Sequence, residues 1–392
     1  MSISASLARG RLDPDRVRER LTDLVRIDSQ NPPGREREAA EHVAEICRAM
    51  GLEVSTHEAV EGRPSVVARM EMGDGPVVGY CSHIDTVPVG PRSAWEREPL
   101  GAEVEDGKLW GRGACDAKGP IVAALEAVEM LRGAEADLAG TLELELVCDE
   151  ETMGLKGARH LVAEGIVNPD VVIVGEPTSL RLVIAQRGAC WIQLTTRGRA
   201  VHGSAPERGV NAILHMAEIL RDLPDSLPDV SHRVLGGPSI NVGTIAGGSK
   251  VNMVADHCVV EIDRRTVPGE TDETVLRGVL QVVERTRARI PDLNAEATVA
   301  FSGEPFEIAE DARLVQEVRA ALDESSDRPA ELMGFRGASD ARFFADAGKD
   351  VVVCGPGDIA LAHTVREHVE LDEVERGAVA YALAFARLLV PA

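Results

Sequence analysis

Apolar positions recur at helical or strand spacing along the first part of this 392-residue chain. A helix is predicted to begin at Pro14 and to end before SQNPPG, and a second amphipathic helix is predicted over residues 37–50. PVVGYCSH, TLELELVCDEE and DVVIVGEP are typical of buried strands, and Pro120 suits the first turn of a further helix. Strands that alternate with helices predict an open α/β sheet.

The pattern changes after about Leu180. Here QRGACWIQLTTRGRA, SINVGTIAGG, VNMVADHCVVEIDRR and AEATVAF are expected as strands, and residues 210–223 and 270–289 as helices. This order favours a small sheet with helices on one face, inserted into the first domain. We therefore expect a domain made of residues 1–180 and 301–392, and an inserted α+β domain over residues 181–300. The first domain would resume with a helix at residues 311–322, the strand DVVVCGPG and a terminal helix.

Acidic residues and histidines follow the predicted strands of the first domain. They are His83, Asp85, Asp116, Glu150, Glu151, Glu176 and His363. Ligand sites of open α/β sheets lie at the carboxyl ends of the strands, so we expect these side chains to converge. Three carboxylates and two imidazoles suit two divalent cations that share one carboxylate, and a further glutamate suits the activation of water.

Each of these residues also has a plainer interpretation. His83 alone could be a structural histidine, although Asp85 two residues later could orient its imidazole, and Asp116 could be a turn residue that bonds its own backbone. The pair Glu150 and Glu151 could be a solvated turn, although the apolar strand before it argues against this. A cysteine nucleophile is disfavoured, since carboxylates surround Cys115 and Cys148 and would raise their pKa.

Composition narrows the choice of partners. The net charge of −23 disfavours nucleic acid and anionic membranes, and small molecules or cations fit better. The N-terminal residues lack the apolar stretch of a secretory signal, and the uncharged run at residues 378–386 is too short to span a bilayer. Seven cysteines without CxxC spacing indicate reduced thiols. We expect a cytoplasmic protein.

The motifs SHIDTVP, GRGACDAKG, CDEE, GEPT, GRAVHGSAP and GPGDIALAHT, taken together, resemble those of a known family. It is the M20 family of dinuclear-zinc metallopeptidases and amidohydrolases, with acetylornithine deacetylase, succinyl-diaminopimelate desuccinylase, aminoacylase-1 and carboxypeptidase G2. The resemblance runs in order from LVRIDSQNPPG to the C-terminus. It implies a zinc-exopeptidase-like catalytic domain with a mixed, mostly parallel sheet, and an inserted lid and dimerisation domain.

The resemblance also implies a role for each matched residue. His83 and Glu176 would bind one zinc ion, Glu151 and His363 the other, and Asp116 would bridge them, with cobalt or manganese as possible alternatives to zinc. Asp85 would support His83, and Glu150 would be the general base. His202 would reach the active site of a partner subunit to stabilise the oxyanion, which implies a homodimer through the inserted domain. The peptide bond after Asp116 is a candidate for the cis form.

Substrate contacts would come from the same resemblance. They involve Asn241, Arg265 and the loop 337–340, with Gly337, Ser339 and Asp340. A guanidinium suits a substrate carboxylate because it can donate two hydrogen bonds. Arg265 could instead form a surface ion pair, and Ser339 could cap a helix.

The motifs and the family resemblance lead to three functional hypotheses. The first is the metal-dependent removal of an acetyl or succinyl group from an N-acyl amino acid. The second is a carboxypeptidase or dipeptidase on the same scaffold. The third is a catalytically silent dimer that binds metal. The sequence does not determine the acyl group or the side chain that the enzyme accepts.

Overall fold

The computed structural model describes residues 4–133, 138–326 and 328–390, which form two compact units. The first unit contains the described residues up to Ile184, those of Ile308–Met333 and those from Ser339 onward. The second contains Ala185–Glu307 and the short stretch Gly334–Ala338. Each unit has an apolar core of its own.

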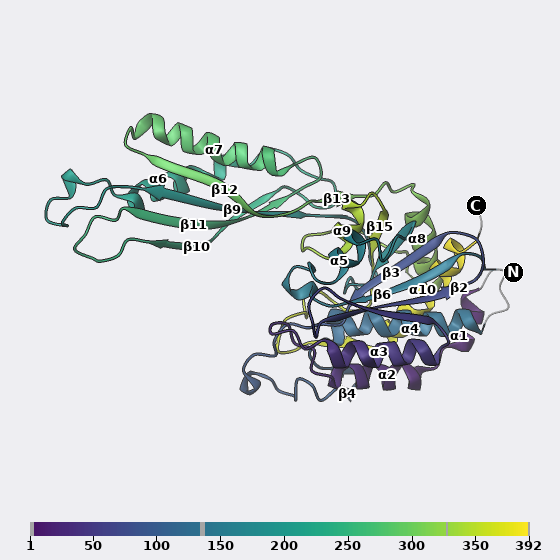
Figure 1. Cartoon of the computed structure of the whole chain (residues 1–392). Helices are drawn as coiled ribbons and strands as arrows, with labels where there is room; N and C mark the ends of the chain where they lie inside the picture. Colours follow the sequence, from purple (N-terminus) through teal and green to yellow (C-terminus); the bar gives the residue numbers. More distant parts are fainter. Residues whose placement is uncertain (1–3, 134–137, 327, 391–392) are drawn as a thin grey trace. The chain divides into compact units, whose positions relative to one another are not determined.

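The larger sheet is mixed, as predicted, and it has a parallel centre (Figure 1). Its strands are Glu53–Glu58 (β1), Pro64–Glu71 (β2), Val77–His83 (β3), Thr141–Val147 (β6), Val171–Val174 (β7), Leu182–Gln186 (β8), Phe306–Glu307 (β13), Leu332–Phe335 (β14) and Asp350–Val353 (β15). Their order is β1-β2-β6-β3-β7-β15-β8-β13, and β14 pairs with β8. The neighbours β6, β3, β7 and β15 are parallel, whereas β1, β2 and β8 pair antiparallel. The parallel strands are thus confined to the centre.

The helices of the first unit are Ala5–Arg11 (α1), Pro14–Arg26 (α2), Arg37–Ala49 (α3), Gly119–Arg132 (α4), Ala158–Ala163 (α5), Arg313–Ser325 (α8), Ala341–Asp346 (α9) and Leu371–Leu388 (α10). Apart from α5 and α9, they form its main apolar core together with this sheet. α4 and α10 pack against each other, and α2 and α8 both contact α10. A small antiparallel sheet contains Glu103–Glu105 (β4), Lys108–Trp110 (β5) and His368–Glu370 (β16). No helix within the described ranges has the length and apolar character that a membrane span requires.

The first predicted helix is confirmed in α2. The side chain of Asp13 accepts hydrogen bonds from the backbone N–H groups of Asp15 and Arg16, and Pro14 occupies the first turn. Both features favour a helix start, because they satisfy or remove N–H groups that have no partner in the helix. The apolar face is buried and consists of Val17, Leu21, Leu24 and Val25.

The second unit is a sheet with helices on one face. Its elements are Gly188–Arg197 (β9), Ala212–Asp222 (α6), Ser239–Gly247 (β10), His257–Thr266 (β11), Asp272–Arg289 (α7) and Asn294–Gly303 (β12). The strand order is β10-β11-β9-β12, and all three pairings are antiparallel. α6 and α7 contact each other and both contact β9, so they cover the same face (Figure 1).

The strand predicted from Val251 begins only at His257. The preceding residues bond to another loop: the carbonyl of Asn252 accepts from the N–H of Gly203 at 2.8 Å, and the N–H of Val254 donates to the carbonyl of Val201 at 3.0 Å. The segment 251–256 therefore forms backbone hydrogen bonds with the loop that carries His202 and does not extend β11.

The strand β6 buries two carboxylates that the alternation of leucines did not predict. Glu143 and Glu145 are 2% and 0% exposed. Arg69 donates to Glu143 at 2.6 Å, and the carboxyl group of Glu145 interacts with that of Glu143. Burial, and then the nearby charge of Glu143, raises the pKa of Glu145 well above its ordinary value. Pro169 lies against Gly79 beside the Glu145 carboxyl group, so the loop after α5 covers this face.

This carboxyl group should make the stability of the protein depend on pH. The folded state keeps Glu145 protonated where the unfolded chain ionises it, so this contribution is complete below pH 4.5 and is lost as the pH rises toward the raised pKa. We expect Glu145→Gln to remove this loss. The melting temperature of the variant, relative to wild type, should then rise between about pH 5.5 and about pH 8.5.

The matched control is Glu71→Gln, at the exposed end of the neighbouring strand β2. This variant should keep the same difference from wild type at both pH values. A constant difference between Glu145→Gln and wild type would show that Glu145 does not titrate in this way.

Candidate active site

The parallel strands bring the predicted acidic residues and histidines to one edge of the sheet. β3 ends at His83, β6 ends three residues before Glu150, and β7 ends two residues before Glu176. These strands are neighbours and parallel, so their carboxyl ends lie side by side. His363 follows β15, which pairs in parallel with β7. The convergence thus has its origin in the topology of the sheet.

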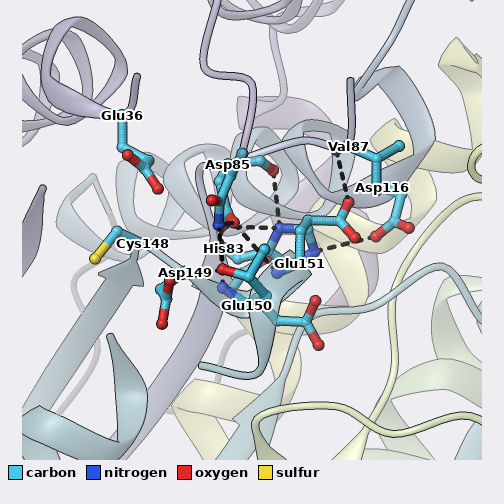
Figure 2. A network of polar contacts seen from close by, with 12 residues as sticks. Glu36, His83, Asp85, Val87, Asp116, Cys148, Asp149, Glu150 and Glu151 are labelled. Carbon is cyan, nitrogen blue, oxygen red and sulfur yellow. Dashed lines mark hydrogen bonds and ion pairs between the residues drawn. The ribbon is translucent and has the colours of Figure 1, made fainter. Parts of the chain in front are cut away.

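Asp116 lies between the two imidazoles. Its Oδ1 is 3.0 Å from Nε2 of His83, and its Oδ2 is 3.3 Å from Nε2 of His363. It belongs to the irregular turn Ala114–Lys118 that precedes α4, and its peptide bond to Ala117 is cis, as the resemblance implied. Figure 2 shows its carboxyl group beside His83 and Glu151. One carboxylate therefore presents an oxygen to each histidine.

A second carboxylate stands beside each histidine. Oε2 of Glu151 is 3.0 Å from Nε2 of His363, and Oε2 of Glu176 is 4.0 Å from Nε2 of His83. Donor atoms of His83, Asp116 and Glu151 lie within 4.8 Å of one another, a separation suited to a metal ion. Each histidine thus has a carboxylate of its own, and both histidines face the carboxylate of Asp116.

Burial gives this cluster unusual protonation behaviour. Burial, followed by the charges of neighbouring carboxylates, raises the pKa of Glu150 and of Glu151, that of Glu150 well above its ordinary value. Hydrogen bonds to Asp116 and then to Glu151 raise the pKa of His363 to about 10. Against the effect of burial, His363 and His83 lower the pKa of Asp116. The buried carboxylates thus require positive charge nearby.

Asp85 holds the turn that carries Glu150 and Glu151. Its Oδ1 accepts from the N–H of Glu150 and its Oδ2 from the N–H of Glu151, both at 3.2 Å. Nδ1 of His83 lies 3.0 Å from the backbone carbonyl oxygen of Asp85 and 3.6 Å from its carboxylate. The imidazole thus bonds to the main chain of Asp85, and the Asp85 carboxylate is directed mainly to the glutamate turn (Figure 2).

Further residues support this turn, and the sequence interpretation missed them. Nδ2 of Asn31 donates to Oδ2 of Asp85 at 2.8 Å. Asp149, in the left-handed backbone region, accepts from Arg63 at 2.8 Å, and Arg63 also pairs with Glu36. Asn31 lies in the quoted motif SQNPPG, but neither this motif nor the spacing of the other residues indicates the contacts.

The predicted substrate residues fall into both units. His202, Asn241, Arg265 and Gly337 belong to the second unit, and Ser339 and Asp340 to the first. His202 and Asn241 are exposed, and Nδ1 of His202 is 2.7 Å from the hydroxyl of Ser204. Nε of Arg265 is 3.0 Å from the carboxylate of Asp263, which is the ion pair considered as its plainer role.

Ser339 and Asp340 are buried at the start of α9. The hydroxyl oxygen of Ser339 accepts from the N–H of Ala341 at 3.4 Å, although the N-cap position of α9 itself is occupied by Asp340. Burial raises the pKa of Asp340 to about 7, and neither of its carboxyl oxygens has a hydrogen-bond partner among the described residues.

The cysteines do not offer a nucleophile. Burial, and then the charge of Glu367, raises the pKa of Cys115 well above its ordinary value, and burial raises the pKa of Cys148 to about 12. All seven cysteines are buried and unpaired.

Comparison with known proteins places this site in a family. Residues 79–387 match the model of peptidase family M20/M25/M40. The chain is 32% identical over 306 residues to an acetylornithine deacetylase from Myxococcus xanthus, with 76% of this chain and 77% of that one covered. It is also 32% identical over 336 residues to a succinyl-diaminopimelate desuccinylase from Stenotrophomonas maltophilia, with coverage of 80% and 84%.

Solved structures share the fold. An aminopeptidase PepT from Bacillus cereus has a TM-score of 0.80 at 22% identity, with 96% of this chain and 100% of that chain covered. A dinuclear-metal-binding M20 peptidase from Bacillus subtilis has a TM-score of 0.73 at 16% identity, with coverage of 96% and 98%. The fold and the family match define a hydrolase of amide bonds. The chain belongs to peptidase family M20/M25/M40.

Proposed function

We propose that this enzyme removes an acetyl or succinyl group from an N-acyl amino acid in a metal-dependent reaction. The observation that carries the proposal is the carboxylate of Asp116 between His83 and His363, with Glu150 on the neighbouring turn. The names of the two relatives above supply the substrate class. A carboxypeptidase or dipeptidase would use the same catalytic groups. A panel of substrates distinguishes these activities from the removal of an acyl group.

The donor set fits two divalent cations. His83 and Glu176 would hold one, His363 and Glu151 the other, and Asp116 would lie between them. The fit rests on charge, because buried carboxylates gather around two imidazoles and the pKa of Glu176 is raised by burial well above its ordinary value. Nitrogen and carboxylate donors suit zinc, and cobalt and manganese accept the same donors.

Glu150 would act as the general base and acid. When bound, the cations would lower the pKa of a water molecule and polarise the acyl carbonyl group. Glu150 would take the proton from the attacking water and give it to the leaving amine. Asp85 would keep Glu150 in place through the backbone bond at 3.2 Å. The products are a carboxylate and an amino acid.

The remaining residues that the family resemblance matches would complete the reaction. His202 would donate a hydrogen bond to the oxyanion in the active site of a partner subunit. Arg265 and Asn241, with backbone donors of the loop that contains Gly337, Ser339 and Asp340, would bind the substrate carboxylate.

A homodimer is consistent with the surface of the second unit. β10 lies at the edge of its sheet, and edge strands offer unpaired backbone groups to another chain. Ile245 on β10 is 57% exposed, and Leu214 on α6 is 63% exposed. We also propose a cytoplasmic location, which the unpaired cysteines favour. The net charge of −23 disfavours nucleic acid and membrane partners.

A panel of N-acetyl and N-succinyl amino acids and of dipeptides tests the activity through the release of amine, with and without chelator. We expect turnover of acylated amino acids that chelator abolishes. Glu150→Gln should lower kcat by about 10²–10⁴-fold while metal stays bound, because the amide cannot transfer the proton.

The control for this variant is Glu164→Gln, an exposed residue next to α5, which should retain wild-type kcat. An unchanged kcat in Glu150→Gln would show that Glu150 is not the general base. Turnover of dipeptides without turnover of acylated amino acids would assign the enzyme to the peptidases of the family.

The role of His202 can be tested in mixed dimers of two impaired variants. Each of Glu150→Gln and His202→Ala should be impaired as a homodimer. A dimer purified through two different tags, one on each variant, has a site with Glu150 intact and His202 supplied by its partner. It should recover about half of wild-type kcat per dimer, since one site of two is complete.

A doubly tagged Glu150→Gln homodimer controls for effects of the tags. If the mixed dimer is as inactive as its parents, His202 does not act across subunits.

A further inference from the structure

Glu367 binds the backbone of the turn that carries Asp116. It lies four residues after His363, is 1% exposed, and directs Oε1 toward three backbone N–H groups. The distances to Oε1 are 2.9 Å from Gly113 N, 3.2 Å from Cys115 N and 3.2 Å from Asp116 N. Its other oxygen pairs with the guanidinium of Arg112, which is 3% exposed. One buried carboxylate thus accepts hydrogen bonds from three backbone N–H groups of this segment and pairs with one guanidinium.

The main chain reinforces this contact. The N–H of Gly111 donates to the carbonyl of Glu367 at 3.1 Å, and the side-chain Nη1 of Arg112 donates to the carbonyl of Thr364 at 3.3 Å. Beyond these residues, β5 and β16 pair antiparallel through Trp110 and His368. The segment before Asp116 is therefore attached along its length to the segment after His363.

The backbone of the turn is shaped to present its N–H groups to one acceptor. Gly113 has a φ of 83°, in the left-handed region, and a Cβ at this position would lie 2.6 Å from Cγ2 of Thr86. N–H groups of such a turn form a concave site for an anion, and the Glu367 carboxylate accepts from those of Gly113, Cys115 and Asp116. Burial raises the pKa of Glu367 to about 7, and its ionised carboxylate makes these hydrogen bonds about twice as strong as a neutral acceptor would.

Glu367 and His363 hold Asp116 at opposite ends. His363 faces the side-chain Oδ2, and Glu367 accepts from the backbone N–H of the same residue. If Glu367 served only to neutralise Arg112, contacts to three N–H groups of the turn would have no use. The contacts instead fix where the Asp116 carboxylate points.

We propose that Glu367 is a positioning residue that orients the shared carboxylate of Asp116 so that both metal ions can bind it. The inference rests on the proposed function, since it concerns the same two cations. Residues that orient metal ligands typically change metal affinity by about 10–100-fold when they are replaced.

Titration of chelator-treated protein with Co²⁺ alone tests the proposal, with calorimetry for affinity and the visible absorption spectrum for coordination. Glu367→Ala should lose about 10–100-fold in affinity for at least one Co²⁺ ion and change the spectrum, while its circular dichroism stays that of wild type. Glu367→Gln keeps an oxygen that can accept N–H groups but loses the charge. It should therefore show a smaller loss, of about tenfold.

Glu370→Ala is the matched control. Glu370 ends the adjoining strand β16 and pairs with Lys108 at 2.9 Å, away from the Asp116 turn, so this variant should bind Co²⁺ as wild type does. Unchanged Co²⁺ affinity in Glu367→Ala would overturn the proposal, and Glu367→Gln decides in the same way if the alanine variant does not fold. Failure of the wild-type protein to bind Co²⁺ would instead contradict the proposed function.

Discussion

The carboxylate of Asp116 faces an imidazole on each side, and the geometry of the site depends on this contact. His83 comes from the end of β3 and His363 from the segment after β15, so the contact joins distant parts of the first unit. Buried carboxylates repel one another unless positive charge lies between them. The histidines, with raised pKa, supply such charge in this structure, and the proposed cations would supply more.

Other polar groups are arranged to keep this contact in place. Asp85 holds the turn of Glu150 and Glu151, and Glu367 holds the turn of Asp116. Both are buried carboxylates that accept backbone N–H groups, so each fixes a main chain and through it a functional side chain. The site is thus supported by two anion-to-backbone contacts on either side of the shared carboxylate.

Much of this could be predicted from the sequence, because an apolar run followed by an acid or a histidine marks the end of a buried strand. His83, Glu151 and Glu176 were placed in this way, and the parallel order of β6, β3 and β7 explains why they meet. The order of the strands was not readable, since it depends on contacts between distant segments. The pairing of Asp116 with both histidines came from the resemblance to the family.

The parts that could not be predicted are the contacts of charged side chains with the main chain. Spacing in HID indicates that Asp85 lies near His83, but not that its carboxylate turns to the glutamates. Glu145 alternates with leucines and would be expected to face solvent, yet the loop at Pro169 covers it. Nothing local in HTVREH shows that Glu367 reaches the turn of Asp116. Such contacts depend on how loops close over strand ends.

The central claim is that Asp116 is shared by two cations, and metal stoichiometry tests it most directly. Chelator-treated wild-type protein should bind two equivalents of zinc per chain. His363→Ala should keep one, since His83, Glu176 and Asp116 remain, whereas Asp116→Ala should lose tight binding of both. Two tightly bound equivalents in Asp116→Ala, or none in the wild-type protein, would contradict the claim.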